Sequence, residues 1–446
     1  MTVSRRSFVT GALGAGGAAA LAGCGFGASS SSSTATSSAS APRSTGPVKG
    51  ELRFSFWGGS DGETRGFTYA KEQFEKKYPG TKITFNVVPY EGFFAGIDRG
   101  LQAGNGPDVF RVDYTTLGKY TSKGVLLDLG PYLDSAEADA YLPAFWQAVQ
   151  YEGKVYGIPH QTDTSCLVYD VAALRAAGIT SVPTTLESAW TWEELAGVAT
   201  KLRASLPDTT FPFAYNWTAA GAFRWLTWLN SAGGSLLKPD LSGPAIPSEA
   251  GTKALEFTQS FFTNRWVPDS NTIKGAKYSD EFFLAKNVAM SFVGSFSVPG
   301  LADPKTGYTG EWAATFLPRD VGASADLGGN AIVVNAESKN PELAAAFVSF
   351  LGSEDMMKYF CEQSIELPTR KSLATADLKY VSRPDVVKIC AQQAATISDD
   401  LVRQCTLPAF SSINTILQDQ LERSFRGAPV DQTQQAMAAA IQSALD

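Results

Sequence analysis

The chain of 446 residues has 44% hydrophobic residues, 37 Lys or Arg, 44 Asp or Glu, and a formal net charge of −7. Its length exceeds what one core usually fills, so we expect two domains, and its hydrophobic content excludes global disorder. The acidic balance disfavours nucleic-acid binding, which requires a basic surface.

The first 23 residues have the pattern of an export signal. Ser4-Arg5-Arg6-Ser7-Phe8 matches the S-R-R-x-F pattern of twin-arginine signals. The weakly apolar run that follows is shorter than the roughly 20 residues that a membrane helix needs. It ends in Leu21-Ala22-Gly23-Cys24, which resembles the lipobox of bacterial lipoproteins. The resemblance implies cleavage before Cys24 and a diacylglyceryl group on its thiol.

Residues 24–48 are predicted to be the lipidated cysteine and a low-complexity tether. Eight of the twelve residues from Ser29 to Ser40 are serine, a composition that cannot bury enough apolar surface to fold. Two acyl chains hold a protein stably at a membrane, whereas one holds it marginally. We therefore expect a folded body from residue 49 onward, anchored to the outer face of the bacterial cytoplasmic membrane.

The first part of this body alternates short strands with helices. Strands are predicted over 52–57, 82–88 and 108–112, and helices over 63–78 and 93–102. This order predicts a parallel sheet with helices on its faces.

The ends of these strands carry polar and aromatic residues. Ligands bind at the carboxyl ends of the strands in parallel sheets. Trp57, Tyr90 and Asp113 are therefore candidate site residues.

The second part of the body has the same alternation with more helix. Strands are expected over 167–169, 288–293, 312–316 and 331–334. Helices are expected over 192–206, 222–231, 254–264, 341–351 and from 384 onward. The predicted fold class is α/β in two lobes.

An ordered series of short motifs resembles family 1 of the extracellular solute-binding proteins, the maltose-binding-protein-like components of ABC importers. The series covers nearly the whole body, and its members are Trp57-Gly58-Gly59, Phe74-Glu75-Lys76-Lys77-Tyr78, Gly106-Pro107-Asp108-Val109, Gly124-Val125-Leu126-Leu127-Asp128-Leu129, Gly153-Lys154-Val155-Tyr156-Gly157-Ile158-Pro159, Leu167-Val168-Tyr169-Asp170, Trp192-Glu193-Glu194-Leu195, Gly233-Gly234 and Gly328-Gly329-Asn330.

The resemblance implies a periplasmic-binding-protein-like fold, in which two α/β lobes are joined by hinge crossings and enclose the ligand. The first lobe would be 49–160 plus 318–352, and the second 161–317 plus 353–446. The crossings would fall near 159–163, 316–318 and 351–355.

The resemblance also implies which residues bind the ligand. Asp113 and Asp163 lie where the family places sugar-binding carboxylates, and Phe296 replaces a tryptophan often found at its position. Trp225 and Trp228 share one helical face beside the cleft of relatives, although such a stripe is more often core. Further expected contacts come from Glu91, which faces the cleft in relatives, and from Gly329, Asn330, Glu366 and Arg370, the last being equally suited to a structural ion pair.

Four cysteines remain in the folded body after Cys24, and an exported protein can form disulfides. Cys166 lies in an apolar strand and is expected to be buried. A bridge among Cys361, Cys390 and Cys405 is predicted without a choice of partners.

The resemblance implies a monomeric lipoprotein that delivers a mono- or oligosaccharide to an ABC permease. No catalysis, cofactor or metal is expected, because His160 is the single histidine and no phosphate loop or nucleophile elbow occurs. The alternatives are a polyol, a phosphodiester or another metabolite as ligand, and, from another class, a secreted carbohydrate-active enzyme.

Overall fold

A computed structural model of the chain describes residues 48–218 and 221–446. The predicted signal, the lipobox with Cys24 and the tether up to residue 47 lie outside the described residues. In the part that is described, no helix is long and apolar enough to cross a membrane.

The first sheet has the strand order β2-β1-β3-β11-β6. Its strands are β1 (Gly50–Trp57), β2 (Thr81–Val88), β3 (Val109–Asp113), β6 (Gly157–Gln161) and β11 (Asn330–Val334). β1 pairs in parallel with β2 and β3, as predicted, whereas β11 runs antiparallel to β3 and β6. The three predicted strands thus pair in parallel as expected, and a strand from more than 200 residues further along the chain, which was not expected here, makes the sheet mixed.

The second sheet has the order β10-β7-β9-β8 and is mostly antiparallel. Its strands are β7 (Ser165–Asp170), β8 (Phe211–Ala214), β9 (Val288–Gly294) and β10 (Trp312–Thr315), and only the β8–β9 pair is parallel. A small hairpin joins β4 (Gln150–Tyr151) to β5 (Lys154–Val155). The first sheet takes its strands from 50–161 and 330–334, and the second from 165–315. How the rest of the chain divides between the lobes stays a prediction.

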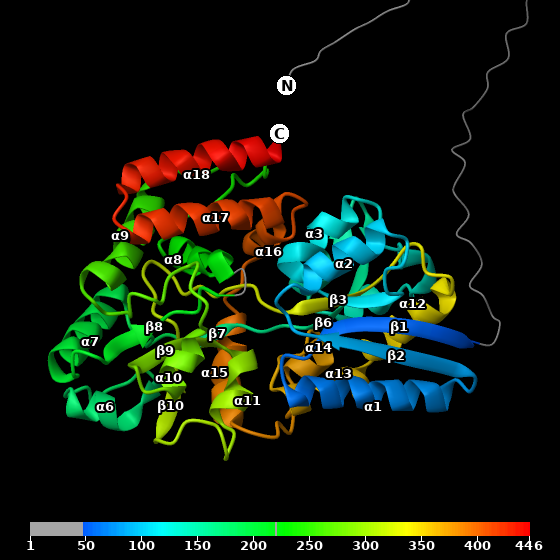
Figure 1. The fold of residues 1–446 in the computed structure, drawn as a ribbon, viewed down its shortest axis with the longest axis horizontal. Coiled ribbons are helices and arrows are strands. Elements are labelled where there is room, and N and C mark those ends of the chain that lie inside the picture. The colour runs from blue at the N-terminus through cyan, green and yellow to red at the C-terminus, as the bar shows by residue number, and fades with distance from the viewer. Residues whose placement is uncertain (1–47, 219–220) are drawn as a thin grey trace, which may run out of the picture. The chain divides into compact units, whose positions relative to one another are not determined.

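Helices cover both faces of the first sheet, with α1 on one side and α2 and α3 on the other (Figure 1). The helices before β7 are α1 (Asp61–Lys77), α2 (Phe93–Gln102), α3 (Tyr114–Thr121), α4 (Glu137–Ala140) and α5 (Pro143–Ala148), with the 3-10 turn η1 (Gly130–Tyr132). Those from β7 to β11 are α6 (Val171–Ala176), α7 (Trp192–Ser205), η2 (Gly221–Trp225), α8 (Leu226–Ser231), α9 (Glu249–Thr263), α10 (Ser279–Leu284), η3 (Ser295–Ser297) and α11 (Val298–Leu301). The last are α12 (Pro341–Leu351), α13 (Glu354–Ser364), α14 (Lys371–Ala374), α15 (Pro384–Ala394), α16 (Asp399–Cys405), α17 (Phe410–Phe425) and α18 (Val430–Leu445).

Helix α1 illustrates how local sequence fixes the first lobe. Ser60 caps the helix, and the Glu63 side chain accepts a hydrogen bond from the Ser60 backbone N–H in return. The apolar face of α1 then packs on β1, where the Phe67 ring lies 4.6 Å from that of Phe56. On its other side α1 contacts α13, and a Cβ atom at Gly66 would lie 2.6 Å from the Phe360 ring. The close approach of the two helices therefore requires glycine at position 66.

The four cysteines among the described residues are all free and buried. They belong to three separate apolar clusters: Cys361 lies against the first sheet, Cys405 lies in the large aromatic core, and Cys166 and Cys390 share the third cluster. The prediction of a bridge among Cys361, Cys390 and Cys405 was wrong, because each of these three side chains lies in a different cluster.

Candidate ligand-binding site

A cavity of about 880 Å³ is lined by strand ends of the first sheet and by helices, turns and loops that include segments flanking the strands of the second sheet. Eight of the side chains or glycines expected from the sequence line it. They are Trp57, Tyr90, Asp113, Asp163, Phe296, Gly329, Asn330 and Glu366. The carboxyl ends of β1 and β3 contribute Trp57 and Asp113, which is where ligands bind in sheets of this kind.

Sheet pairing assembles the hydrogen bonds around Asp113. β11 pairs with β3 so that Asn330 lies opposite Asp113, and Asn330 Nδ2 donates to Asp113 Oδ1 at 2.7 Å. The Tyr90 hydroxyl donates to Asp113 Oδ2 at 2.6 Å, and Gln161 Nε2 donates to Asn330 Oδ1 at 2.6 Å. Burial raises the pKa of Asp113 to about 6, although the Tyr90 hydrogen bond and the guanidinium of Arg111 oppose the rise. The carboxylate is thus held in one orientation at the cavity wall.

Asp163 is 8% exposed and lies in the same wall. Burial raises its pKa to about 7, with the Arg224 guanidinium opposing the rise and the Asp326 and Asp113 carboxylates adding to it. A Cβ atom at position 328 would lie 2.1 Å from Asp163 Oδ1, so Gly328 leaves room for the carboxyl group. Burial also raises the pKa of Glu366, whose Oε2 accepts a hydrogen bond from the Ser295 hydroxyl at 3.1 Å.

Two buried arginines in the wall are residues that the sequence analysis missed. Arg111 Nη2 pairs with Glu63 Oε1 at 2.5 Å, and its guanidinium lies 4.3 Å from the centre of the Trp57 ring. Arg224 Nε pairs with Asp326 Oδ2 at 3.2 Å. A signal for Arg111 was present, because a cation inside the apolar run Val109–Asp113 must find a buried partner.

Two pairs of aromatic rings line the cavity. Trp57 and Tyr90 form an edge-to-face pair with centroids 5.2 Å apart on the side of the first sheet. Tyr278, at the N-cap of α10, and Phe296, in η3, form a second such pair at 6.3 Å. Apolar ring faces beside fixed carboxylates and amides can recognise a ligand that presents both C–H surface and hydroxyl groups.

The structure does not bring four of the expected residues to this wall. Trp225 and Trp228 are 0% and 1% exposed, and they lie in the aromatic core, where Trp225 Nε1 donates to Thr258 Oγ1 at 3.3 Å. Their stripe is thus core, the alternative that helical spacing already allowed. Glu91 is exposed and does not line the cavity, while Arg370 forms an ion pair with Glu137 at 2.7 Å.

His160 lies in the core beside this site. Its ring stacks on Phe67 with centroids 5.2 Å apart and an interplanar angle of 19°. Burial and the nearby Arg111 lower the pKa of His160 to about 3, so the imidazole is neutral. Within residues 48–218 and 221–446, no group of three His, Cys, Asp or Glu is arranged to hold a metal ion.

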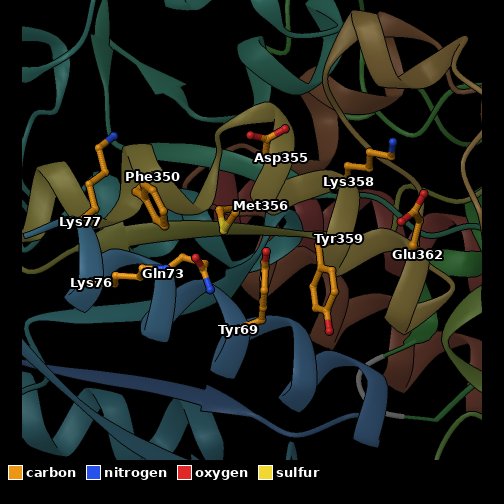
Figure 2. Close-up of a pocket in the computed structure, with 10 residues that line it drawn as sticks. All are labelled: Tyr69, Gln73, Lys76, Lys77, Phe350, Asp355, Met356, Lys358, Tyr359 and Glu362. Carbon is orange, nitrogen blue, oxygen red and sulfur yellow. The ribbon is translucent and has the colours of Figure 1, made fainter.

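A second hollow, of about 680 Å³, lies between α1 and α13 (Figure 2). Tyr69 and Tyr359 stack in it at 4.0 Å, and the surrounding side chains include Lys76, Lys77 and Lys358. None of the residues expected from the sequence lines this hollow. The cavity between the sheets is therefore the stronger candidate for a ligand site.

The sequence matches the model of a protein family described as bacterial extracellular solute-binding protein over residues 60–358. A probable ABC transporter-binding protein of Deinococcus radiodurans is 28% identical over 324 residues, 68% of this chain and 73% of that protein. The arabinooligosaccharide-binding protein of Bacillus subtilis is 26% identical over 71% of this chain and 72% of its own length. The maltooligosaccharide ABC transporter solute-binding lipoprotein of Streptococcus pneumoniae is 24% identical over 66% of this chain and 67% of its own length.

Solved structures show the same fold at low sequence identity. The GacH receptor of Streptomyces glaucescens, solved unliganded and with acarbose, has a TM-score of 0.74 at 22% identity and covers 88% of this chain and 98% of its own. A solute-binding protein of Agrobacterium radiobacter in complex with ribitol has a TM-score of 0.73 at 24% identity, and the match covers 89% of this chain and 100% of that protein. The predicted two-lobed α/β fold is confirmed by these likenesses.

Proposed function

Since the chain belongs to the bacterial extracellular solute-binding protein family, we propose that it is the binding component of an ABC importer for carbohydrate. It would take a mono- or oligosaccharide into the cavity between the sheets and deliver it to a membrane permease. The observation that carries the proposal is the fixed Asp113 carboxylate in a cavity that is also lined by two aromatic pairs, Trp57 with Tyr90 and Tyr278 with Phe296. Relatives whose names specify arabino- and maltooligosaccharides support carbohydrate as the ligand class.

The free energy of binding that the cavity residues could supply is also large enough for a sugar ligand. Burying half of an aromatic ring, roughly 100 Å², contributes about 2.5 kcal/mol at 25 cal/mol per Å². Two such contacts and a few hydrogen bonds reach the roughly 8 kcal/mol that micromolar affinity requires, even after ordering costs. A ligand that contacts both aromatic pairs at once would stabilise the conformation in which the two pairs lie closest to each other, and the permease would then recognise this loaded conformation.

We also propose that the protein is exported by its twin-arginine signal, lipidated at Cys24 and held at the membrane as a monomer by the tether of residues 24–48. The relative from Streptococcus pneumoniae named as a lipoprotein supports the anchor. Metabolic labelling with a fatty-acid analogue tests it: wild-type protein should carry the label, and the Cys24→Ser variant should not.

Thermal unfolding of the full Cys24→Ser chain in the presence of monosaccharides, oligosaccharides, polyols and other metabolites tests the ligand class. A ligand at 100 times its Kd adds about 2.7 kcal/mol of stability, which gives a clear rise in Tm. We expect at least one carbohydrate to raise the Tm of the parent chain and not that of Asp113→Asn. The matched variant Asp139→Asn, at an exposed position, should respond as the parent does.

The same screen separates the alternatives. A rise with a polyol or another metabolite, and with no carbohydrate, would contradict the carbohydrate proposal. Steady release of products from a bound glycan would contradict the proposal that the protein binds without catalysing.

A further inference from the structure

The interior of the cavity holds more carboxyl groups than cations. Among the described residues that line it, Arg111 and Arg224 are the buried cations, and each is already in an ion pair, with Glu63 and Asp326 respectively. The other arginine among these residues, Arg65, is exposed, and none of them is a lysine. Within the described part of the chain, four further carboxyl groups of the wall have no ion-pair partner: Asp113, Asp163, Asp280 and Glu366.

The buried cations do not compensate these four groups. Burial is the largest cause of a raised pKa in all four. The pKa of Asp163 rises to about 7, because burial and the charges of Asp326 and Asp113 outweigh the opposing effect of Arg224 and Arg111. A positive charge brought by a ligand would therefore find a surplus of carboxyl groups in this interior.

Asp163 differs from Asp113 in its hydrogen bonds. Both side-chain oxygens of Asp113 accept a hydrogen bond, from the Asn330 amide and from the Tyr90 hydroxyl. The side-chain oxygens of Asp163 accept none from the described residues, although only 8% of this residue is exposed. Gly328 leaves room beside the carboxyl group, which lies in the cavity wall. Because buried polar groups are nearly always hydrogen-bonded, the missing partner of Asp163 is expected to come from a ligand.

The backbone around Asp163 holds this carboxyl group in place. The residue lies in the link between β6 and β7, and its carbonyl oxygen accepts a hydrogen bond from the Gly328 N–H at 3.2 Å. The preceding residue, Thr162, exchanges two backbone hydrogen bonds with Leu367, at 2.9 and 3.0 Å. A ligand group that fits Asp163 thus does not have to order this segment when it binds.

The missing partner has to supply charge as well as hydrogen bonds. An ammonium group supplies both, because it carries three N–H donors and a positive charge. A hydroxyl group supplies a donor but leaves an ionised carboxylate buried without a counter-charge, which is costly. An anionic ligand group would add to the repulsion among the carboxyl groups of the wall.

We infer that the cavity selects a cationic carbohydrate, a sugar that carries an ammonium group, and that the Asp163 carboxylate binds this group. The inference rests on the proposed carbohydrate-binding function and narrows its ligand class from sugars in general to amino sugars.

The test compares matched sugars on the full Cys24→Ser chain by isothermal titration calorimetry at pH 7, below the pKa of about 8 that is typical of such an amine. Each series has a neutral sugar, its amino derivative and its N-acetylamino derivative. The series are built on glucose, on galactose and on the β-1,4-linked glucose disaccharide. In at least one series we expect the amino sugar to bind at least about tenfold more tightly than both uncharged members, given one charge-assisted hydrogen bond to a buried carboxylate.

The variant Asp163→Asn keeps the shape of the side chain and removes its charge. The preference for the amino sugar over the neutral sugar should fall from about tenfold to within about twofold in this variant. The matched control Asp269→Asn makes the same change at an exposed position outside the cavity, and it should keep the preference of the parent. Thermal unfolding of Asp163→Asn shows whether the variant is folded, and the comparison of sugars on the parent chain does not depend on it.

The outcomes are distinct. If the amino sugar binds no more tightly than the neutral sugar in every series, the inference is overturned and the proposed function stands. An N-acetylamino sugar that binds as tightly as the amine in each series also overturns it, because shape and not charge is then selected. A preference that persists in folded Asp163→Asn overturns the role of Asp163. Failure of every carbohydrate to bind, charged or neutral, overturns the proposed function and this inference together.

Discussion

Asp163 is a buried carboxyl group in the cavity wall, and replacing it with asparagine isolates the effect of its titration on stability. Burial raises its pKa to about 7, while an unfolded chain would release the proton near pH 3.8. Between these values the folded chain holds a proton that the unfolded chain has lost. Folding stability therefore decreases as pH rises through this interval.

The size of the effect follows from proton linkage. Between pH 5 and pH 8, one carboxyl group with this change of pKa removes about 2.7 kcal/mol from the free energy of unfolding. Asp163→Asn has no such titration, so its stability should fall less than that of the parent over this range, by about 2 to 3 kcal/mol. The pKa values of Asp113 and Glu366 are also raised by burial, and both groups are present in the parent and in Asp163→Asn. The variant should therefore still lose some folding stability as pH rises.

Urea unfolding followed by tryptophan fluorescence at pH 5, 6, 7 and 8 measures this difference, using the full Cys24→Ser chain as parent. Asp269→Asn is the control, because Asp269 is exposed and lies outside the cavity wall. If Asp163→Asn and the parent lose the same stability between pH 5 and pH 8, the proposed proton on Asp163 is refuted. A rise in stability of the parent over this range would refute it as well.

Three further predictions concern the site, the backbone beside it and the core. Phe296→Ala should weaken binding of the carbohydrate found in the screen by up to about 70-fold, which is equivalent to the roughly 2.5 kcal/mol from half a ring's area, while Trp228→Phe in the core should leave calorimetric affinity within about twofold. Gly329→Ala should lower Tm strongly, because Gly329 has a φ of +98° and a Cβ there would lie 2.5 Å from the Gln161 carbonyl oxygen; an unchanged Tm would contradict this account. A thiol reagent should find no fast-reacting cysteine in the folded Cys24→Ser chain and four after unfolding in urea; fewer than four in urea would indicate a disulfide.

Local elements with clear start and stop signals were predictable from the sequence. The helices over 93–102 and 341–351 have the predicted bounds, because an apolar stripe is bounded by glycine or proline at the ends. The helix predicted over 222–231 is instead a 3-10 turn, η2, followed by α8. The apolar pattern of this segment showed that it is buried but did not distinguish a 3-10 helix from an α-helix.

The candidate site was predictable where it follows the ends of strands in the first sheet. Trp57 and Asp113 are recognisable because each ends a short apolar run. The cavity-lining residues Ser411, Asn414, Thr415 and Gln418 of α17 were missed, because a stripe of Ser, Asn, Thr and Gln on a helix has the same pattern as an ordinary solvent-facing surface. Only the packing of α17 against α3 turns that stripe toward the cavity.

The sequence by itself determined the α/β alternation, the export and lipidation motifs, the family resemblance and the residues at the strand ends. The tertiary structure decided which aromatic residues reach the cavity: it places Phe296 in the wall and Trp228 in the core. The tertiary structure also decided that Asn330 donates a hydrogen bond to Asp113, 217 residues earlier in the chain. The antiparallel pairing of β11 with β3 that brings them together could not be predicted from a local pattern. The physical reason is the same in each case. Periodicity shows which residues share a face, and only long-range packing determines what that face meets.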